Sequence, residues 1–302
     1  MSSAATILAL ATIALWSFLA YLGASLSNVP PFLLAGIALC ISGLIGAVRI
    51  RQWRVPLKTL AMGVTGIFGY NCLYFIALQN APAVEASLIN YLWPLLIVVL
   101  SPLYLSGYTL KPHHLIGSAA GLAGAALIVT GGRLTLDMAN MSGYIFAAIA
   151  AVTWASYSLL TKRVPPFSTA AVGSFTMISG ILALGVHFTF ETAYTPTSRD
   201  WMFLVLLGAG PLGGAFFTWD AAMKKGDPRI IGSLSYLTPL TSTLVLVALG
   251  GHEFKWVTGV AMFLIVMGAV IGSLDMIRPK KRSANTDHLP ITDNQLAVTS
   301  SQ

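Results

Sequence analysis

The sequence Asn90-Tyr91-Leu92-Trp93-Pro94-Leu95 lies in the middle of an apolar run, residues 84–105, that is long enough to cross a bilayer. A similar stretch, Ser235-Tyr236-Leu237-Thr238-Pro239-Leu240, lies inside a second apolar run, residues 229–249. The tyrosines of the two stretches are 145 residues apart, and so are the prolines. Two corresponding membrane helices are therefore each expected to carry a proline near mid-depth, and such paired interruptions indicate the binding site of a transporter.

The composition predicts a membrane protein. The chain has 302 residues, of which 56% are hydrophobic and only 9% are charged, and its mean hydropathy is +0.78. A soluble domain carries about 25% charged residues, so lipid is the expected solvent for this much apolar surface. The net charge of +7 is interpreted as a signal of membrane topology, and no nucleic-acid partner is expected.

The distribution of apolar residues predicts an all-α membrane protein with ten transmembrane helices. Ten runs each approach the roughly 20 residues that span a bilayer. They cover residues 4–25, 30–48, 57–80, 84–105, 113–131, 142–161, 168–190, 200–223, 229–249 and 255–276.

Basic residues fall in alternate loops, which predicts the orientation of the chain. Fourteen of the 17 basic residues lie on one side of the predicted helices: Arg49, Arg51, Arg54, Lys58, Lys111, Lys162, Arg163, Lys224, Lys225, Arg229, Arg278, Lys280, Lys281 and Arg282. The other side has only Arg133, Arg199 and Lys255. The bias of basic loops toward the cytoplasm places both termini there.

An internal repeat divides the chain. The offset of 145 residues also pairs Gly63 with Gly208 and Gly69 with Gly214. We expect one five-helix repeat over residues 1–138, a second over residues 139–277 and a disordered cytoplasmic tail over residues 278–302. Because five is an odd number, the second repeat would be inverted in the membrane, which is an architecture that supports alternating access.

These features resemble those of a known family. Two inverted five-helix halves that carry Tyr91-Leu92-x-Pro94-Leu95 and Tyr236-Leu237-x-Pro239-Leu240 are similar to the EamA type of the drug/metabolite transporter superfamily. The closest resemblance within that superfamily is to bacterial aromatic amino acid exporters. It implies a secondary transporter that exports amino acids, both aromatic and other neutral ones, across the bacterial inner membrane.

The prolines and the aromatic and amide side chains at similar depth form the predicted substrate site. Pro94 would free the backbone carbonyl of Asn90, and Pro239 that of Ser235, because proline lacks an N–H. A neutral cavity with aromatic walls suits a small amphipathic solute such as an amino acid. Simple helix kinks and ordinary packing are the alternative explanations. The expected substrate-binding residues are Trp16, Tyr70, Asn71, Tyr74, Asn90, Tyr91, Trp93, Pro94, Trp154, Tyr157, Phe216, Ser235, Tyr236, Thr238 and Pro239, whereas Trp201 and Trp219 are expected at the membrane interface.

No acidic or basic residue occupies the centre of an apolar run, so no obvious proton relay is predicted. Asp220 is expected near a helix end with Lys224 as its partner four residues on, and His187 with Glu191 is expected to form an interfacial pair. His113-His114 is expected to begin a helix with no third metal ligand nearby. Facilitated movement down the substrate gradient is the simplest mechanism.

The sequence therefore favours a carrier with no catalytic residue, no metal and no cofactor, whose partners are a small solute and the lipid bilayer. Export of another small metabolite or drug is the main alternative. A membrane-embedded enzyme would need a buried base, nucleophile or metal cluster, and a channel or scaffold would not need paired mid-depth prolines.

Overall fold

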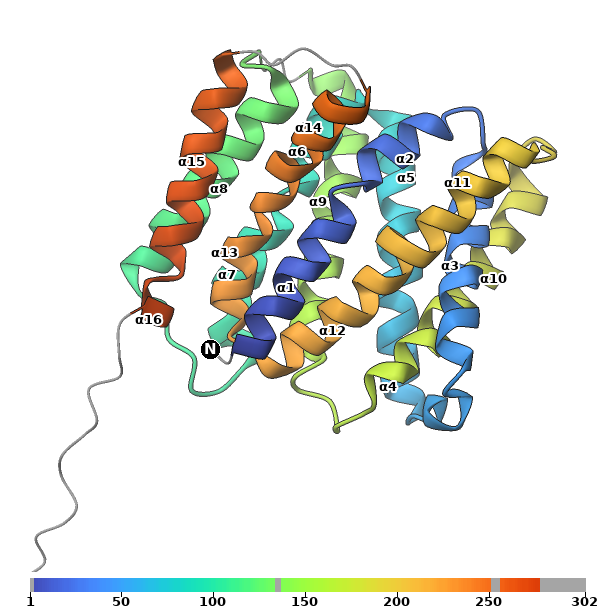
Figure 1. The fold of residues 1–302 in the computed structure, drawn as a ribbon, viewed down its shortest axis with the longest axis horizontal. Coiled ribbons are helices and arrows are strands. Elements are labelled where there is room, and N and C mark those ends of the chain that lie inside the picture. The colour runs from blue at the N-terminus through green and yellow to red at the C-terminus, as the bar shows by residue number, and fades with distance from the viewer. Residues whose placement is uncertain (1–2, 134–136, 251–255, 278–302) are drawn as a thin grey trace, which may run out of the picture.

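In the computed structural model, which describes residues 3–133, 137–250 and 256–277, the described chain consists of helices and their connections (Figure 1). The helical elements are α1 (Ser3–Trp16), α2 (Leu19–Ser25), α3 (Pro31–Ala47), η1 (Ile50–Trp53), α4 (Leu57–Val64), η2 (Thr65–Gly69), α5 (Tyr70–Asn80), α6 (Ala83–Asn90), α7 (Trp93–Tyr104), α8 (Pro112–Thr130), η3 (Met138–Asn140), α9 (Met141–Leu160), η4 (Thr169–Ala171), α10 (Val172–Phe190), α11 (Ser198–Ala209), η5 (Gly210–Gly214), α12 (Ala215–Lys225), α13 (Pro228–Ser235), α14 (Leu237–Gly250), α15 (Trp256–Gly272) and α16 (Leu274–Ile277).

Eight helical segments of the described chain are long and apolar enough to cross a membrane. They are Ser3–Ser25, Leu57–Asn80, Ala83–Tyr104, Pro112–Thr130, Met138–Leu160, Thr169–Phe190, Ser198–Lys225 and Pro228–Leu249. The two remaining apolar runs form shorter helices, α3 and α15, of 17 residues each. The fold is thus that of a multi-pass membrane protein, and the predicted tail over residues 278–302 lies outside the described residues.

Both proline-containing segments are broken, as the sequence predicts. The first ends its α6 portion at Asn90 and resumes as α7 at Trp93, so that Pro94 occupies the first turn of the new helix. The second ends α13 at Ser235 and resumes as α14 at Leu237. A proline is tolerated in the first turn of a helix because an N–H group at that position would have no helical carbonyl to donate to.

The 145-residue offset holds for whole elements. Residues Thr65–Gly69 and Gly210–Gly214 are both π-helical turns, and α5 and α6 begin and end 145 residues before α12 and α13. π-helical turns are rare and are frequent near functional sites. The repeat seen in the sequence is therefore a repeat of backbone conformation.

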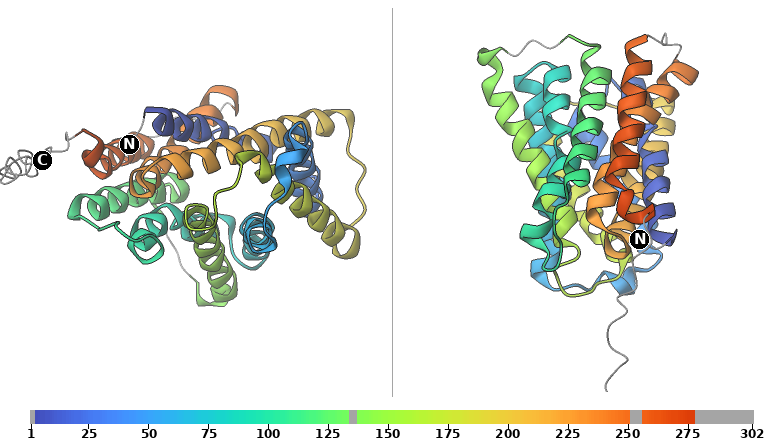
Figure 2. Two further views of the ribbon diagram at one scale, coloured as in Figure 1. Left: turned by 90° about the horizontal axis from the view of Figure 1, so that it is seen from below. Right: turned by 90° about the vertical axis from the view of Figure 1, so that its left-hand side faces the viewer.

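Two long helix pairs flank the bundle, α3 with α10 on one side and α8 with α15 on the other (Figures 1 and 2). Glycines make this packing close. A Cβ added at Gly36 would lie 2.8 Å from the side chain of Leu184, and one at Gly268 would lie 2.6 Å from the carbonyl oxygen of Gly117. Small residues let membrane helices approach at backbone distance.

Gly63 and Gly66 also serve close packing, because a Cβ at these positions would overlap the rings of Phe175 and Tyr157. Between the flanking pairs lie α1, α7, α9 and α12, which hold the site described below. Figure 1 also shows the N-terminus at the same end of the bundle as the connections that follow α3, α7, α9 and α12.

Candidate functional site

Four tryptophans from four helices meet in the centre of the bundle. They are Trp16 of α1, Trp93 of α7, Trp154 of α9 and Trp219 of α12, and every pair of their rings is within 6.5 Å between centroids. The closest pair is Trp16 with Trp219, at 5.1 Å. Most of these contacts are edge-on or tilted, which is the arrangement that aromatic quadrupoles favour. We call these four residues the indole cluster.

The indole cluster is almost closed to solvent, since its members are only 1–7% exposed. A buried indole N–H needs an acceptor. Trp16 Nε1 donates to the carbonyl of Pro211 in the π-helical turn η5, and Trp219 Nε1 donates to the Ser158 hydroxyl at 3.0 Å. These bonds fix the orientation of two rings.

The expectation that Trp219 lies at the membrane interface is wrong, because its side chain is 1% exposed and belongs to the indole cluster. Trp219 lies near the end of the apolar run 200–223, and that position wrongly suggested a place at the membrane surface. The helical segment Ser198–Lys225 has 28 residues, which is longer than a bilayer requires. The distance of a residue from the end of this helix therefore does not give its depth in the membrane. Trp201, by contrast, is 47% exposed.

Three further rings predicted for the site surround Trp154. The centroids of Tyr70, Tyr157 and Phe216 lie 5.3, 5.4 and 5.5 Å from it. Tyr74 stacks on Tyr70 at 6.0 Å. The structure thus gathers most of the predicted aromatic residues on α1, α5, α7, α9 and α12 around one point.

The amide of Asn90 joins this group and that of Asn71 does not. Asn90 Nδ2 donates to the Tyr70 hydroxyl at 3.1 Å, and the side chain is 7% exposed. Its Oδ1 atom has no hydrogen-bond partner within the described chain. Asn71 instead donates to the carbonyl of Ile67 in the preceding π-helical turn η2, at 2.8 Å.

The residues predicted from the second broken segment lie in a different environment. Ser235 donates to the carbonyl of Ile231 in its own helix, and Thr238 is 8% exposed with no partner for its hydroxyl among the described residues. Tyr236 is fully buried in an apolar group with Leu240 and Ile265, and Pro239 is also buried. None of these side chains contributes a ring contact to the indole cluster.

Tyr236 nevertheless reaches the first broken segment. Its hydroxyl accepts the N–H of Leu95 and donates to the carbonyl of Tyr91, both at 3.2 Å. The two proline-containing stretches, 90–95 and 235–240, are thus in direct contact through one phenol group.

A buried ion pair lies one residue beyond the indole cluster. Asp220 is 0% exposed, and its Oδ2 atom accepts from Lys224 and from Thr169, each at 2.6 Å. The predicted pairing with Lys224 is confirmed, although burial of the carboxylate is deeper than its place near a helix end suggested. Lys224 also donates to the carbonyl of Phe167 and lies 3.3 Å from the centre of its ring.

A second lysine closes the adjacent helix end. Lys162 donates to three carbonyls at the C-terminus of α12, those of Met223, Lys224 and Gly226, at 2.8–3.1 Å. Burial lowers the pKa of this ammonium, yet the three carbonyls are the partners that a helix C-terminus offers to a cation.

Two histidine clusters lie away from the site. His187 Nδ1 is 2.8 Å from Glu191 Oε2, so the predicted pair forms, and the His187 side chain is buried. The Glu191 carboxylate also accepts the N–H groups of Phe32 and Leu33, so it caps the N-terminus of α3.

The expectation of no third ligand near His113-His114 is wrong. Asp275 of α16 lies 3.3 Å from both rings, and donor atoms of the three residues are within 4.8 Å of one another. However, His114 Nδ1 accepts the N–H of Lys111, which places the proton of a neutral ring on the Nε2 atom that faces Asp275. Partial burial opposes ionisation of Asp275, but Lys111 and the imidazoles hold its pKa below the usual value. This arrangement fits an ion-pair cluster better than a metal site.

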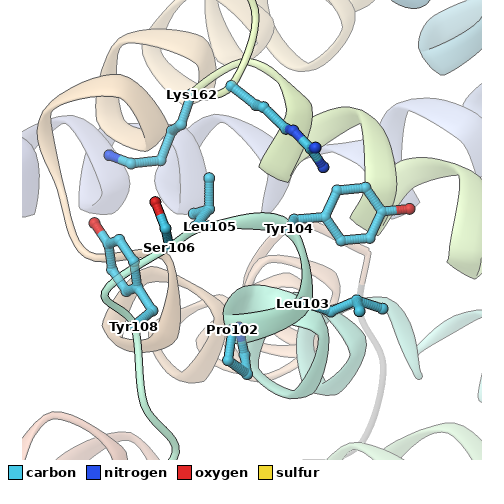
Figure 3. A pocket seen from close by; sticks show the side chains of 8 residues that line it. Pro102, Leu103, Tyr104, Leu105, Ser106, Tyr108 and Lys162 are labelled. Atoms are coloured by element: carbon cyan, nitrogen blue, oxygen red, sulfur yellow. The ribbon is translucent and has the colours of Figure 1, made fainter.

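A cavity of about 590 Å³ opens between the end of α7 and the segment after α9 (Figure 3). The figure shows the hydroxyl groups of Ser106 and Tyr108 on the side where Lys162 extends. Arg163 also lines the cavity, whose walls include Leu103 and Leu105. Burial raises the pKa of Tyr108, and Asp227 raises it further.

The chain belongs to the EamA-like transporter family, which matches residues 1–130 and 141–274. It is accordingly a transporter of the drug/metabolite superfamily. It is 39% identical over 281 residues to the aromatic amino acid exporter YddG of Ancylobacter novellus, with 90% of this chain and 98% of that protein covered.

A more distant relative and a solved structure also match most of the chain. The aromatic amino acid exporter YddG of Escherichia coli is 28% identical, with 79% of this chain and 86% of that protein covered. A crystal structure that is 38% identical in sequence superposes with a TM-score of 0.87 and covers 92% of this chain and 100% of its own.

Proposed function

We propose that this protein exports aromatic and other neutral amino acids across the bacterial inner membrane by alternating access. The observation that carries the proposal is the indole cluster, in which four helices each contribute one tryptophan to a common centre. Relatives named as aromatic amino acid exporters support the same substrate class.

The aromatic groups suit the two ends of such a substrate. Indole faces attract an ammonium group, by about 0.5–2 kcal/mol depending on desolvation, and they stack with an aromatic side chain. Apolar walls discriminate weakly by size, because one methylene changes binding by only about 1–3 kcal/mol. Broad specificity over neutral amino acids is therefore expected.

Two buried polar atoms supply specific contacts. Asn90 Oδ1 and Thr238 Oγ1 both lack a hydrogen-bond partner within the described chain. Leaving a buried polar group unpaired costs about 1–3 kcal/mol, and a substrate ammonium or carboxylate would recover that cost. Asn90 is the better placed of the two, because it already contacts Tyr70 beside the indole cluster.

The membrane arrangement that we propose has ten spans in two inverted repeats. α3 and α15 have 17 residues each, which gives a helix of about 26 Å at 1.5 Å per residue and approaches the thickness of the hydrocarbon core. The connections that carry most basic residues lie at one end of the bundle together with the N-terminus (Figure 1). That distribution supports cytoplasmic termini and a cytoplasmic opening near Ser106.

The proposed transport is facilitated. Asp220 is buried, but the ammonium of Lys224 already compensates its charge at 2.6 Å, so the pair forms a neutral structural unit that need not exchange a proton during transport. The gradient of the amino acid then drives net movement. The role is that of a carrier and not of an enzyme.

Counterflow in proteoliposomes tests the proposal. Vesicles loaded with unlabelled phenylalanine should accumulate external labelled phenylalanine transiently, and unlabelled methionine or threonine should compete. An uncoupler should leave counterflow unchanged. Counterflow no greater than in protein-free vesicles would refute the transport proposal, whereas counterflow that collapses with the uncoupler would refute only the facilitated mechanism.

A further inference from the structure

The Tyr236 hydroxyl occupies the place of a backbone hydrogen bond. It accepts from the N–H of Leu95 and donates to the carbonyl of Tyr91. These two backbone groups are four residues apart, and in a continuous α-helix they would bond directly to each other. The phenol has therefore inserted into one hydrogen bond of the segment that Pro94 interrupts.

The ring of Tyr236 is held firmly in this position. It is fully buried, and it packs on Gly121 of α8, where an added Cβ would lie 2.5 Å from a ring carbon. Backbone groups freed within a membrane need a partner from the protein, because lipid offers none. Tyr236 of the second repeat thus supplies the hydrogen-bond partner for two backbone groups at the break in the first repeat.

The matching residue of the first repeat does not return this contact. Tyr91 follows α6 as Tyr236 follows α13, at the offset of 145 residues. Its hydroxyl makes no hydrogen bond to any described residue, and the residue lies partly exposed near Tyr70 and Tyr74. The pair is therefore symmetric in sequence and asymmetric in the structure.

We propose that Tyr236 and Tyr91 exchange this role during transport. In the present state Tyr236 is inserted at the break between α6 and α7, and in the opposite state Tyr91 is inserted at the break between α13 and α14. The inference rests on the proposed function, because alternating access in inverted repeats interchanges the conformations of the two halves. Both tyrosines are then positioning residues, each of which stabilises one of the two end states.

Two variants that each remove a single oxygen atom test the exchange. Spin labels at Ser106 and Arg163, which both line the cavity between the end of α7 and the segment after α9, would report the populations of the two states from their distance distribution. Tyr236→Phe should lower the population ratio of the present state to the opposite state by about three- to tenfold, as loss of one or two hydrogen bonds implies. Tyr91→Phe should raise the same ratio by a similar factor.

The double variant Tyr91→Phe/Tyr236→Phe should return the ratio to near the wild-type value, since both states lose equivalent bonds. Tyr104→Phe is the matched control, because that hydroxyl donates to Ser156 outside both breaks and its loss should not change the ratio. Shifts of the two single variants in the same direction, or no shift with Tyr91→Phe, would overturn the exchange. Those outcomes are distinct from failure of the proposed function, which would appear as absence of counterflow in the wild-type protein.

Discussion

The stretches 90–95 and 235–240 share a sequence pattern and a break in the helix, yet their side chains have different surroundings. In the first stretch, Trp93 belongs to the indole cluster and Asn90 contacts Tyr70. In the second, Ser235 bonds to its own helix and Tyr236 completes the hydrogen bonding of the first break. An internal repeat thus preserves backbone conformation while the side chains at matched positions take on separate tasks.

The largest difference is expected between Trp93 and Thr238, which occupy matched positions. Trp93→Ala should raise the KM for phenylalanine by roughly thirtyfold, since truncating a central aromatic contact typically costs about 2 kcal/mol. Thr238→Ala should raise it by only about threefold, because a single hydroxyl contact to the substrate is worth about 0.5–1.5 kcal/mol. Flux in proteoliposomes measures both, with Trp201→Ala as a control because that ring is 47% exposed.

Thermal unfolding of each purified variant would separate loss of binding from loss of fold. Trp93→Phe keeps an aromatic face and should recover most of the affinity. Equal KM values for Trp93→Ala and the wild type would remove the first stretch from the substrate site and leave the two stretches without a functional difference.

A smaller difference is expected between Asn90 and Ser235, which are also matched. Asn90→Ala removes a buried amide that contacts the Tyr70 hydroxyl, so the KM should rise by about tenfold, as expected for one or two lost hydrogen bonds. Ser235→Ala removes only a bond to the carbonyl of Ile231 within the same helix and should stay within about twofold. A larger effect for Ser235→Ala would reverse the assignment of the two stretches.

The sequence predicted the helices well, for a physical reason. Apolar runs, prolines at helix starts and paired breaks are local signals, and α6, α7, α13 and α14 begin and end near the positions that those signals indicate. The paired glycines Gly63 and Gly208 each lie two residues before a π-helical turn, η2 and η5, although the sequence pattern did not indicate that these turns are π-helical.

The site was less predictable, because its geometry depends on contacts between distant residues. Trp219 was excluded on its position along the helix, although its ring lies 5.1 Å from that of Trp16. Asp275 approaches His113 only after the last helix returns beside α8. Nothing local in the sequence indicates that the hydroxyl of Tyr236, a predicted substrate-binding residue, bonds to the backbone of Tyr91 and Leu95. Periodicity indicates which side chains are buried and not which ones meet.

The close packing of Gly121 against the Tyr236 ring can be tested without changing the tyrosine. In Gly121→Ala the new methyl group would meet the Tyr236 ring at 2.5 Å, and such overpacking typically costs about 1–3 kcal/mol. Thermal stability in detergent should fall by several degrees. Gly69→Ala is the matched control, because its Cβ would meet only Thr65 at an ordinary 3.6 Å. Equal melting temperatures for the two variants would show that the ring can move aside.

The smallest effect on activity is expected from a test of direction, which asks whether the two broken segments run in opposite senses. In inverted repeats, α7 ends on the same side on which α13 begins. In a background in which Cys40 and Cys72, the two cysteines of the chain, are replaced by alanine, Ser106→Cys and Lys225→Cys should not react with an impermeant thiol reagent outside intact cells. Ser198→Cys, before α11, should react. All three positions are exposed, so flux should be unchanged.

The physical reason for the expected labelling pattern is the excess of basic residues in the connections after α7 and α12, since such connections stay on the cytoplasmic side. Labelling of Lys225→Cys but not of Ser106→Cys would mean that the repeats are parallel, and the exchange of Tyr91 and Tyr236 would then lose its structural basis.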